Sequence, residues 1–313
     1  MSEQTLRCSL TLADGSRRAL TGLRSWELVR TDGDACDSFS VTADLPASGL
    51  GRLTEAVGFL AEHGGVRVFT GLIDEYELAL DANGSALRVH GRGMGARLLD
   101  NQVVANVWHS AQLADILATY VTPYGLKASA CALPAVTSFA VSSGNTCMQV
   151  VKGFCIHAGA LVPRFDANGT LLISTARPSS GQTLRQSQLL SAVYRDCRYG
   201  VISRQTVLHT ATRAVSEAFY PAFSARGGLR REVVSTGGSD LRAVWRTAQQ
   251  RIDAAREDEF TLQATIAGSF FCEPGTILNV SLPKLGLSGG FNVRQVRSCC
   301  SEEGCLCTLT LFR

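Results

Sequence analysis

Long apolar runs, lysine and net charge are all scarce in this sequence of 313 residues. No stretch of about 18 apolar residues occurs, so we expect no helix that spans a membrane. The first residues lack the apolar core of a signal peptide and alternate apolar with polar side chains, as a half-buried strand does. We therefore expect a protein that is made and folded in the cytosol. The net charge of +3 is too small to imply a polyanionic partner.

Cysteine is common, with 11 residues, but the number is odd and the spacing is irregular. In a chain without an export signal this pattern argues against a disulfide framework. Most of the thiols are interpreted as small buried apolar groups. Hydrophobic residues make up 45% and charged residues 18% of the chain, which is typical of a globular protein long enough for two or three domains.

Two stretches of the chain repeat one order of strands and turns. Residues 65 to 91 indicate a strand, a glycine-led second strand, a turn at Asn83-Gly84 and a third strand. Residues 274 to 312 show a similar order, with PGTILNV, a glycine-rich turn, GGFNVRQVRS, the turn SEEG and CLCTLTLF. The likeness is weak residue by residue, so the duplication is a hypothesis about architecture.

Apolar spacing divides the chain into two strand-rich ends and a middle with helices. We predict a β-dominated α+β protein with domains at 1–100, 101–195 and 196–313. Four helices are expected: at 53–62, after a cap at Ser110 with a stop at Pro123, at about 146–159, and at 240–257. The last has a cap at Ser239 and an apolar stripe formed by Leu241, Val244, Trp245, Ala248, Ile252 and Ala255.

The densest group of thiols is CCSEEGCLC, which contains Cys299, Cys300, Cys305 and Cys307. Four thiolates at one point would hold a zinc ion. Neighbours in a strand point to opposite faces, however, so at most three of the four converge easily in a hairpin. Buried or edge thiols are therefore the preferred interpretation, with a metal site as the alternative.

Two other patterns have a chemical and a structural interpretation. Residues 286 to 290 match GxSxG around Ser288, but strand residues follow where a nucleophile elbow requires a helix. We interpret the segment as a glycine hairpin. The loop arginines Arg226, Arg230 and Arg231 lack the interleaved aromatic residues of a nucleic-acid platform. A solvated or subunit-interface loop is favoured for them.

Taken in order, several segments resemble the phage tail baseplate hub family, the late control protein D group of contractile tails. The resemblance covers most of the chain and rests on the order and spacing of segments that contain no catalytic signature. These segments are DACDSFSVTADLP from Asp34, FTGLIDEYEL from Phe69, HGRGMGARLLDNQ from His90, and the terminal PGTILNV, GGFNVRQVRS and TLTLF. The cysteine-rich hairpin has no counterpart in the family pattern.

The resemblance implies two tail-tube-like β-barrel domains with a small α+β insertion domain between them. It also implies a homotrimeric, pseudo-hexameric ring in a virion or tail-like particle, assembled in the host cytoplasm. The implied partners are the tail tube ring, the central spike and other baseplate proteins, with no membrane and no specific nucleic acid, although DNA would pass through the channel. The helices at 53–62 and 240–257 would pack on the barrel exteriors.

Six residues are interface candidates, and no cofactor or catalytic residue is expected. The interface candidates are Arg226, Arg230, Arg231, Asn83, Gly84 and Gly289. Two alternatives remain open: an enzyme that uses the thiols or Ser288, and a nucleic-acid-binding β-barrel protein.

Overall fold

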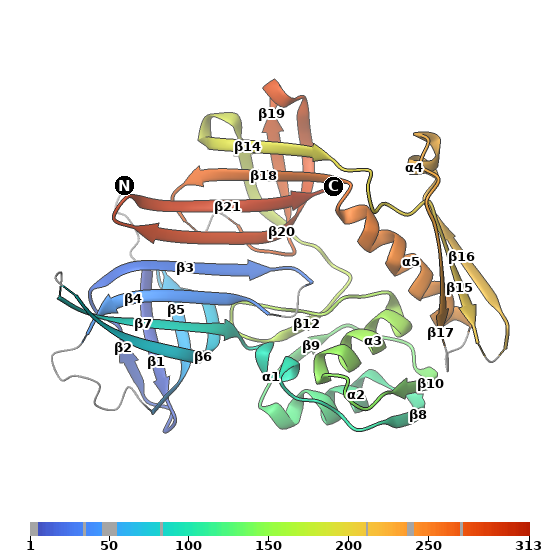
Figure 1. Ribbon diagram of the computed structural model, residues 1–313, viewed down its shortest axis with the longest axis horizontal. Coiled ribbons are helices and arrows are strands. Elements are labelled where there is room, and N and C mark those ends of the chain that lie inside the picture. Colours follow the sequence, from blue (N-terminus) through green and yellow to red (C-terminus); the bar gives the residue numbers. More distant parts are fainter. Residues whose placement is uncertain are drawn as a thin grey trace.

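A computed structural model describes residues 6–33, 36–45, 55–81, 84–210, 212–236, 241–269 and 272–313 of the chain (Figure 1). In this part of the chain the fold is a β-dominated α+β arrangement with one large sheet of 13 strands and three small sheets. None of the helices described there is long and apolar enough to cross a membrane. The large sheet contains strands from both ends of the sequence.

The N-terminal part of the large sheet has the strand order β3-β4-β7-β6-β5-β1-β2. The sheet curls, because Phe39 of β4 stacks on Phe59 of β5 with ring centroids 3.9 Å apart although two strands separate them, and Phe69 of β6 lies edge-on to both. The strands are β1 (Leu6–Leu12), β2 (Arg17–Ala19), β3 (Leu23–Thr31), β4 (Ser38–Asp44), β5 (Ala56–His63), β6 (Val66–Asp81) and β7 (Gly84–Gly93).

The C-terminal part has the order β14-β18-β21-β20-β19-β13. Its inward side chains form a separate apolar core that includes the buried residues Leu262, Phe291 and Leu309. The strands are β13 (Ser179–Arg185), β14 (Leu189–Asp196), β18 (Phe260–Ala267), β19 (Ile277–Leu282), β20 (Leu287–Ser301) and β21 (Gly304–Phe312), and the short helices η3 (Gln186–Gln188) and η4 (Pro283–Leu285) connect them.

Between these parts lies a helical unit with its own core around Ile116, Phe154 and Leu171. Helix α3 begins with a capping box, in which the Thr146 hydroxyl accepts from Gln149 N and the Gln149 side chain accepts from Thr146 N. The elements are α1 (Ala96–Leu99), β8 (Asn106–Ala111), α2 (Leu113–Tyr120), η2 (Thr122–Tyr124), β9 (Ala128–Ala130), β10 (Val136–Val141), α3 (Cys147–Gly159), β11 (Arg164–Phe165) and β12 (Leu171–Ile173).

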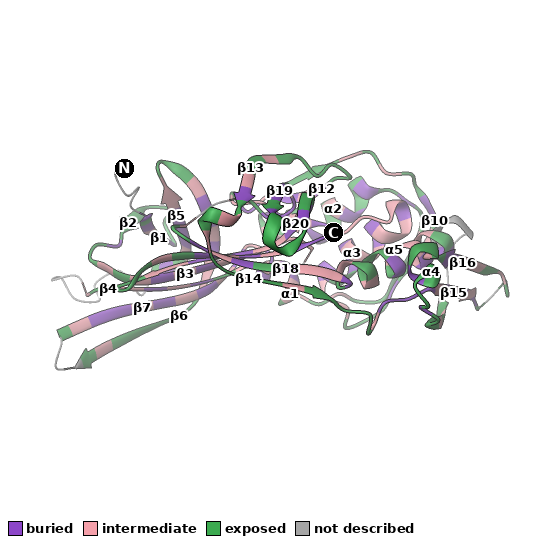
Figure 2. Cartoon of the chain, turned by 90° about the horizontal axis from the view of Figure 1, so that it is seen from above, coloured by how far each residue is buried: buried purple, intermediate pink, exposed green. Residues whose placement is uncertain are grey.

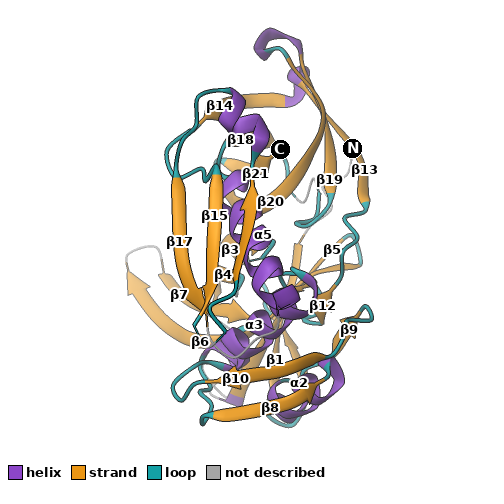
Figure 3. Ribbon diagram, turned by 90° about the vertical axis from the view of Figure 1, so that its right-hand side faces the viewer, coloured by secondary structure: helices purple, strands orange, loops and turns teal. Residues whose placement is uncertain are grey.

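A three-stranded sheet stands at one side of the molecule, covered by α5 (Figure 3). Val244, Ala248 and Ile252 of the helix are buried against the sheet residues Val207 and Ala218. The elements are β15 (Arg204–His209), β16 (Val215–Phe219), α4 (Pro221–Ala225), β17 (Arg231–Thr236) and α5 (Leu241–Glu257).

The two ends of the chain are copies of one strand arrangement. In strand order, β3-β4-β7-β6-β5-β1 of the first copy corresponds to β14-β18-β21-β20-β19-β13 of the second. We name these sets the N-terminal and C-terminal sheet modules. Their first strands differ, because β1 pairs antiparallel with β5 whereas β13 pairs parallel with β19. The duplication predicted from the sequence is thus present as a repeated topology, but the predicted strand division is wrong: residues 66–81 form one strand, β6, and the counterpart of the PGTILNV strand β19 is β5.

The correspondence extends to single residues. In the hairpin β20–β21, Val293 faces Leu311, and the register then shifts before Gln295. In β6–β7, Ile73 faces Gly91 and the register shifts before Glu75, so each residue matches the one 220 positions earlier in the sequence. A second shared bulge lies between Leu23 and Ser25 in β3 and between Leu189 and Ser191 in β14. Bulges at matching places indicate one module used twice.

The structure corrects the prediction of two separate barrels. No closed barrel occurs in the described residues, because the two modules join side by side in one curled sheet. The predicted helix at 53–62 is also wrong: from Ala56 this segment is strand β5, paired with β1 and β6 on its two sides. Gly64 and Gly65, predicted to end a helix, have positive φ angles in the turn of the β5–β6 hairpin.

The other helix predictions have mixed outcomes. The helices at about 146–159 and 240–257 are confirmed as α3 and α5. Ser110 is not a cap, because it lies in β8 and α2 begins after Gln112. Helix α5 packs on the small β15–β17 sheet and on α3 rather than chiefly on a barrel. Trp245 of its predicted stripe is half-exposed, and the Ser239 cap and the Leu241 side chain lie outside the described residues.

Candidate assembly interface

The two modules meet where β3 pairs antiparallel with β20. The paired residues run from Trp26 opposite Cys300 to Thr31 opposite Gln295, and we call these two segments the β3–β20 seam. The seam makes the sheet continuous from the first module into the second, as Figure 1 shows in the stack of β20 on β3. Each module would otherwise have an uncovered edge strand here, β3 in the first and β20 in the second, and the pairing covers both edges.

The two faces of the seam differ in character. On the inner face, Leu28 and Ser298 lie opposite one another and both are buried. On the open face, Glu27 accepts hydrogen bonds from Arg297, with distances of 2.8 Å from Nε and 2.5 Å from Nη2 to Oε2. The Glu27 carboxylate raises the pKa of Arg297 above its ordinary value. Because this pair is exposed, apolar burial on the inner face contributes more to the seam than the ion pair does.

Buried charges lie at one end of the seam. Arg30 of β3 is buried and forms ion pairs with Glu273 and, at 3.7 Å from Nε to Oδ2, with Asp37. Asp37 also accepts a hydrogen bond of 2.8 Å from Thr31 N. Burial raises the pKa of Asp37 to about 6, an effect that the neighbouring Arg30 opposes. This network ties the N-terminal module to the loop that precedes β19.

A second ion-pair group ties the middle unit to both modules. Asp32 forms an ion pair with Arg177, with 2.5 Å between Nη1 and Oδ2, and a second with Arg164, with 3.5 Å between Nε and Oδ1. These residues line a cavity of about 580 Å³ that also borders α5 and the β20–β21 strands. The arginines fix the relative positions of three units.

Each end of the continuous sheet has an uncovered edge. From Glu75 to Asp81, β6 pairs with β7 on one side, and β14 pairs with β18 on one side. Within the residues that the structure describes, no other strand covers these two edges. They lie at opposite ends of the sheet in Figure 1, and the β6–β7 hairpin projects from the body in Figure 2 with β6 largely exposed.

The three arginines proposed for an interface have partners inside the chain. Arg226 forms ion pairs with the buried Glu259 and, at 3.3 Å, with Asp196, and its guanidinium lies over the Phe260 ring. Arg230 pairs with Glu232 at 2.7 Å, and Arg231 begins β17 with an exposed side chain. The structure therefore gives Arg226 a role in packing the α4 loop onto β14 and β18. An interface role for the three residues stays a prediction.

The proposed interface hairpins lie apart from that loop. Gly84 is exposed at the start of β7 with φ of 109°, and Asn83 lies outside the described residues. Gly289 is exposed in β20 with φ of 102°. Residues 287 to 290 begin strand β20, which pairs with β19 across the turn formed by η4 and Gly286, so the segment belongs to a hairpin and not to a strand-to-helix elbow.

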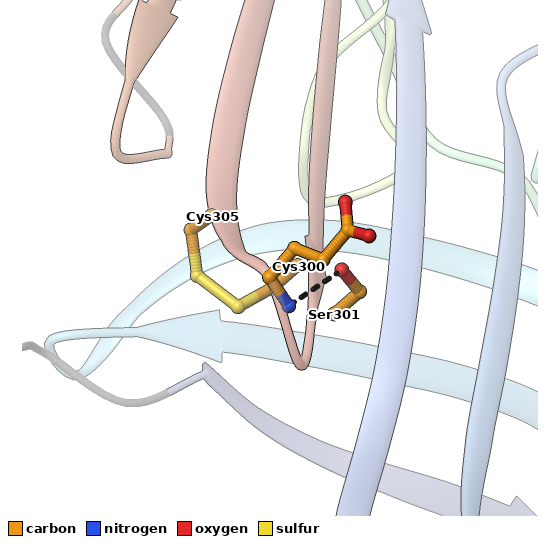
Figure 4. Close-up of a disulfide and its surroundings, with 4 residues drawn as sticks. Cys300, Ser301 and Cys305 are labelled. Atoms are coloured by element: carbon orange, nitrogen blue, oxygen red, sulfur yellow. Dashed lines mark hydrogen bonds between the residues drawn. A yellow bond between two sulfur atoms is a disulfide. The ribbon is translucent and has the colours of Figure 1, made fainter.

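The cysteine cluster contains a disulfide. Cys300 and Cys305 face each other in the β20–β21 hairpin and form a cross-strand bond, beside a turn where Glu303 N donates to Ser301 Oγ (Figure 4). The nine other cysteines form no disulfide, so there is one disulfide and no framework. Cys307 is buried in the C-terminal core opposite Ser298, whereas Cys299 lies opposite Leu306, so the two thiols point to opposite faces of the hairpin. No cluster of three or more metal-ligating side chains occurs in the part of the chain described.

Sequence reasoning missed the seam and both free edges. The residues concerned are ordinary strand residues, and alternation alone does not tell a covered strand from an uncovered one. A signal was present in the duplicated hairpin. Aligning residues 65–91 with 285–311 places Leu78 on Ser298, whose partner strand in the same chain is β3.

No family model matches this chain, and no curated protein matches its sequence. Solved structures do resemble it. The tail protein of Neisseria meningitidis MC58 matches with a TM-score of 0.79 and 18% identity over 98% of this chain and 96% of that chain. The 43 kDa tail protein of prophage MuSo2 of Shewanella oneidensis matches with a TM-score of 0.78 and 15% identity, over 99% and 98% respectively.

A more distant structural likeness is to a component of a secretion system. A component of the E. coli type VI secretion system, described as structurally similar to two T4 bacteriophage tail proteins, matches with a TM-score of 0.50 and 11% identity over 93% of this chain and 73% of that chain. At such identities the likeness concerns the fold. The chain therefore has the fold of phage tail proteins.

Proposed function

We propose that this protein is a structural hub of a phage or phage-like contractile tail. Three copies would form a ring that joins the hexameric tail tube to the three-fold central spike. The repeated sheet module carries the proposal, because three chains with two modules each supply six similar units around one axis. The shared fold with tail proteins supports the same class of function.

The open face of the sheet suits the wall of a water-filled channel. One row of directly opposite residues crosses both modules and the seam and is mainly polar: Arg92, Ser38, Val29, Arg297, Thr308 and Thr265. The neighbouring row on the other face is buried: Gly91, Phe39, Leu28, Ser298, Cys307 and Ile266. A sheet with one core face and one solvated face can line a lumen without exposing apolar groups.

The proposed partners follow from this geometry. The tube ring would stack on one end of the six-module ring and the spike on the other, with further baseplate proteins outside. The protein would reside in the baseplate of a virion or tail-like particle. The domain divisions at 1–100, 101–195 and 196–313 belong to this proposal, with the part of 101–195 that precedes β13 as an insertion on the ring's exterior, because β13 and β14 belong to the C-terminal sheet module. A non-enzymatic role agrees with the structural tail proteins that share the fold.

Electron microscopy of the purified protein mixed with its tail tube protein tests the proposal. We expect averaged end views to show three copies around a central hole and side views to show the ring at the end of a tube. A ring with another number of subunits, or a complete lack of binding to the tube, would contradict it. Steep salt-dependent retention on DNA would instead favour the nucleic-acid alternative.

A further inference from the structure

We infer that the free edge of β6, from Glu75 to Leu80, pairs with β14 of a second copy of this chain, from Ala192 to Cys197. The pairing is antiparallel and has the register that β20 and β3 have inside one chain. The inference rests on the proposed ring and names the strands that close it. Six equivalent seams would result, three within chains and three between them.

The repeated topology identifies the partners. Strand β6 occupies in the N-terminal module the place that β20 occupies in the C-terminal module, and β14 corresponds in the same way to β3. Inside the chain, β20 of one module pairs with β3 of the other. The remaining pair, β6 with β14, lies at opposite ends of one sheet, so it can form only between two copies (Figure 1). Such a head-to-tail contact generates rings when the rotation closes.

Burial shows what the missing strand would cover. Val296 and Ser298 of β20 are 5% and 1% exposed beside β3, whereas their counterparts Tyr76 and Leu78 are 38% and 43% exposed. On the partner strand, Leu28 of β3 is 1% exposed, and its counterpart is the half-buried Tyr194. Large apolar side chains thus stand exposed at positions that are buried when the equivalent edge is covered. Exposed apolar strand edges are templates for pairing with another chain.

The register can be derived residue by residue from the β3–β20 seam. Subtracting 220 from each β20 number and adding 166 to each β3 number, the offsets that the shared bulges fix, converts each pair of the seam into a pair between copies. The result is Cys197 opposite Glu75, Asp196 opposite Tyr76, Arg195 opposite Glu77, Tyr194 opposite Leu78, Val193 opposite Ala79 and Ala192 opposite Leu80.

The side chains are complementary in this register although it was derived from backbone pairing alone. Arg195 meets Glu77 directly on the open face, whereas in the β3–β20 seam Arg297 lies opposite Val29 and pairs with Glu27 two residues away. Tyr194 meets Leu78 on the inner face, and Val193 meets Ala79. A slip by one residue would place Arg195 against an apolar neighbour and turn every side chain of β14 to the wrong face.

Paired cysteines test the register in the intact protein. In a Cys197→Ser background, which removes an exposed native thiol, we would combine Ala79→Cys with Val193→Cys. A matched control combines Glu75→Cys with Val193→Cys, which lie on the same face but four residues out of register. After mild oxidation, non-reducing electrophoresis should show linked dimers and trimers for the first combination at about ten times the yield of the control, because only directly opposite Cβ atoms come within about 5.5 Å.

The outcomes separate this inference from the proposed function. Native mass measurement of the same samples gives the number of subunits independently of the cross-link. Three subunits without the in-register cross-link would overturn the strand pairing and keep the hub. The cross-link in a particle without three subunits would keep the pairing and overturn the hub. An isolated chain at every concentration tested would overturn both.

Discussion

Glu27 of β3 and Arg297 of β20, 270 residues apart in the sequence, form an ion pair of 2.5 Å across the seam between two copies of one module. The contact joins the N-terminal and C-terminal sheet modules, which lie side by side in one sheet. Glu77 of β6 corresponds to Arg297, and Arg195 of β14 corresponds to Val29, the residue directly opposite Arg297, so the same register brings two opposite charges face to face between chains. We therefore treat the intrachain seam as the template for the contact between chains.

The inner face of the seam should dominate its stability. Replacing Leu28 with Ala removes a fully buried side chain and should lower the free energy of unfolding by about 2–5 kcal/mol. Replacing Arg297 with Gln breaks an exposed ion pair and should cost less than about 1 kcal/mol. Chemical denaturation of both variants at equal protein concentration compares the two values. A larger loss for Arg297→Gln would show that we have ranked the two faces wrongly.

Charge reversal should report the pairing between chains. Glu77→Arg and Arg195→Glu should each weaken assembly, because like charges then face each other, and the double variant should restore most of it. The dissociation constant measured by analytical ultracentrifugation should rise by about tenfold in each single variant. Lys127→Glu, a reversal at an exposed residue of the middle unit, is the matched control and should leave assembly unchanged. No recovery in the double variant would argue against this register.

Asp37 should give stability a specific dependence on pH. Its folded pKa of about 6 lies above the ordinary value of 3.8, so the folded state holds a proton that the unfolded state has released between these values. The stability of the native protein relative to an Asp37→Asn variant should therefore fall as pH rises from 4 to 6, by up to about 3 kcal/mol. Denaturation curves across this range measure the difference. A difference that is constant or rises with pH would contradict the raised pKa.

Thiol reactivity should separate buried from exposed cysteines. Burial raises the pKa of Cys8 and of Cys155 to about 12, so both remain protonated and shielded at pH 8. Cys197 is exposed in the isolated chain and should react with iodoacetamide there. If β14 pairs with β6 of a neighbouring chain, the labelling of Cys197 should be slower in the assembled particle than in the isolated chain. Peptide mass spectrometry of dilute and assembled samples measures both effects, and rapid labelling of Cys8 or Cys155 would contradict the described core.

The sequence predicted features encoded locally and missed those that depend on distant partners. Helix α3 has its capping box and α5 its apolar stripe within a few turns, so both were predictable. The segment from Ala56 to His63 carries apolar residues at helical spacing, but strands β1 and β6 bind it on both sides and override that pattern. The β3–β20 seam joins residues 270 positions apart, which no local pattern specifies.

The candidate interface was predictable only in outline. The likeness of the two hairpins was visible in the sequence, whereas the shared bulges before Glu75 and Gln295 that fix the offset appear only in the strand register. Arg226 was proposed for an interface because loop arginines often serve there. Its ion pair with the buried Glu259 depends on the folding of β18 beside the α4 loop.

An electron cryo-microscopy map of the assembled particle tests the central claim most directly. We predict three chains that form one continuous sheet of six modules, with β6 of each chain beside β14 of the next and Leu78 opposite Tyr194. A particle whose chains meet through other surfaces, leaving the β6 edge exposed, would contradict the account.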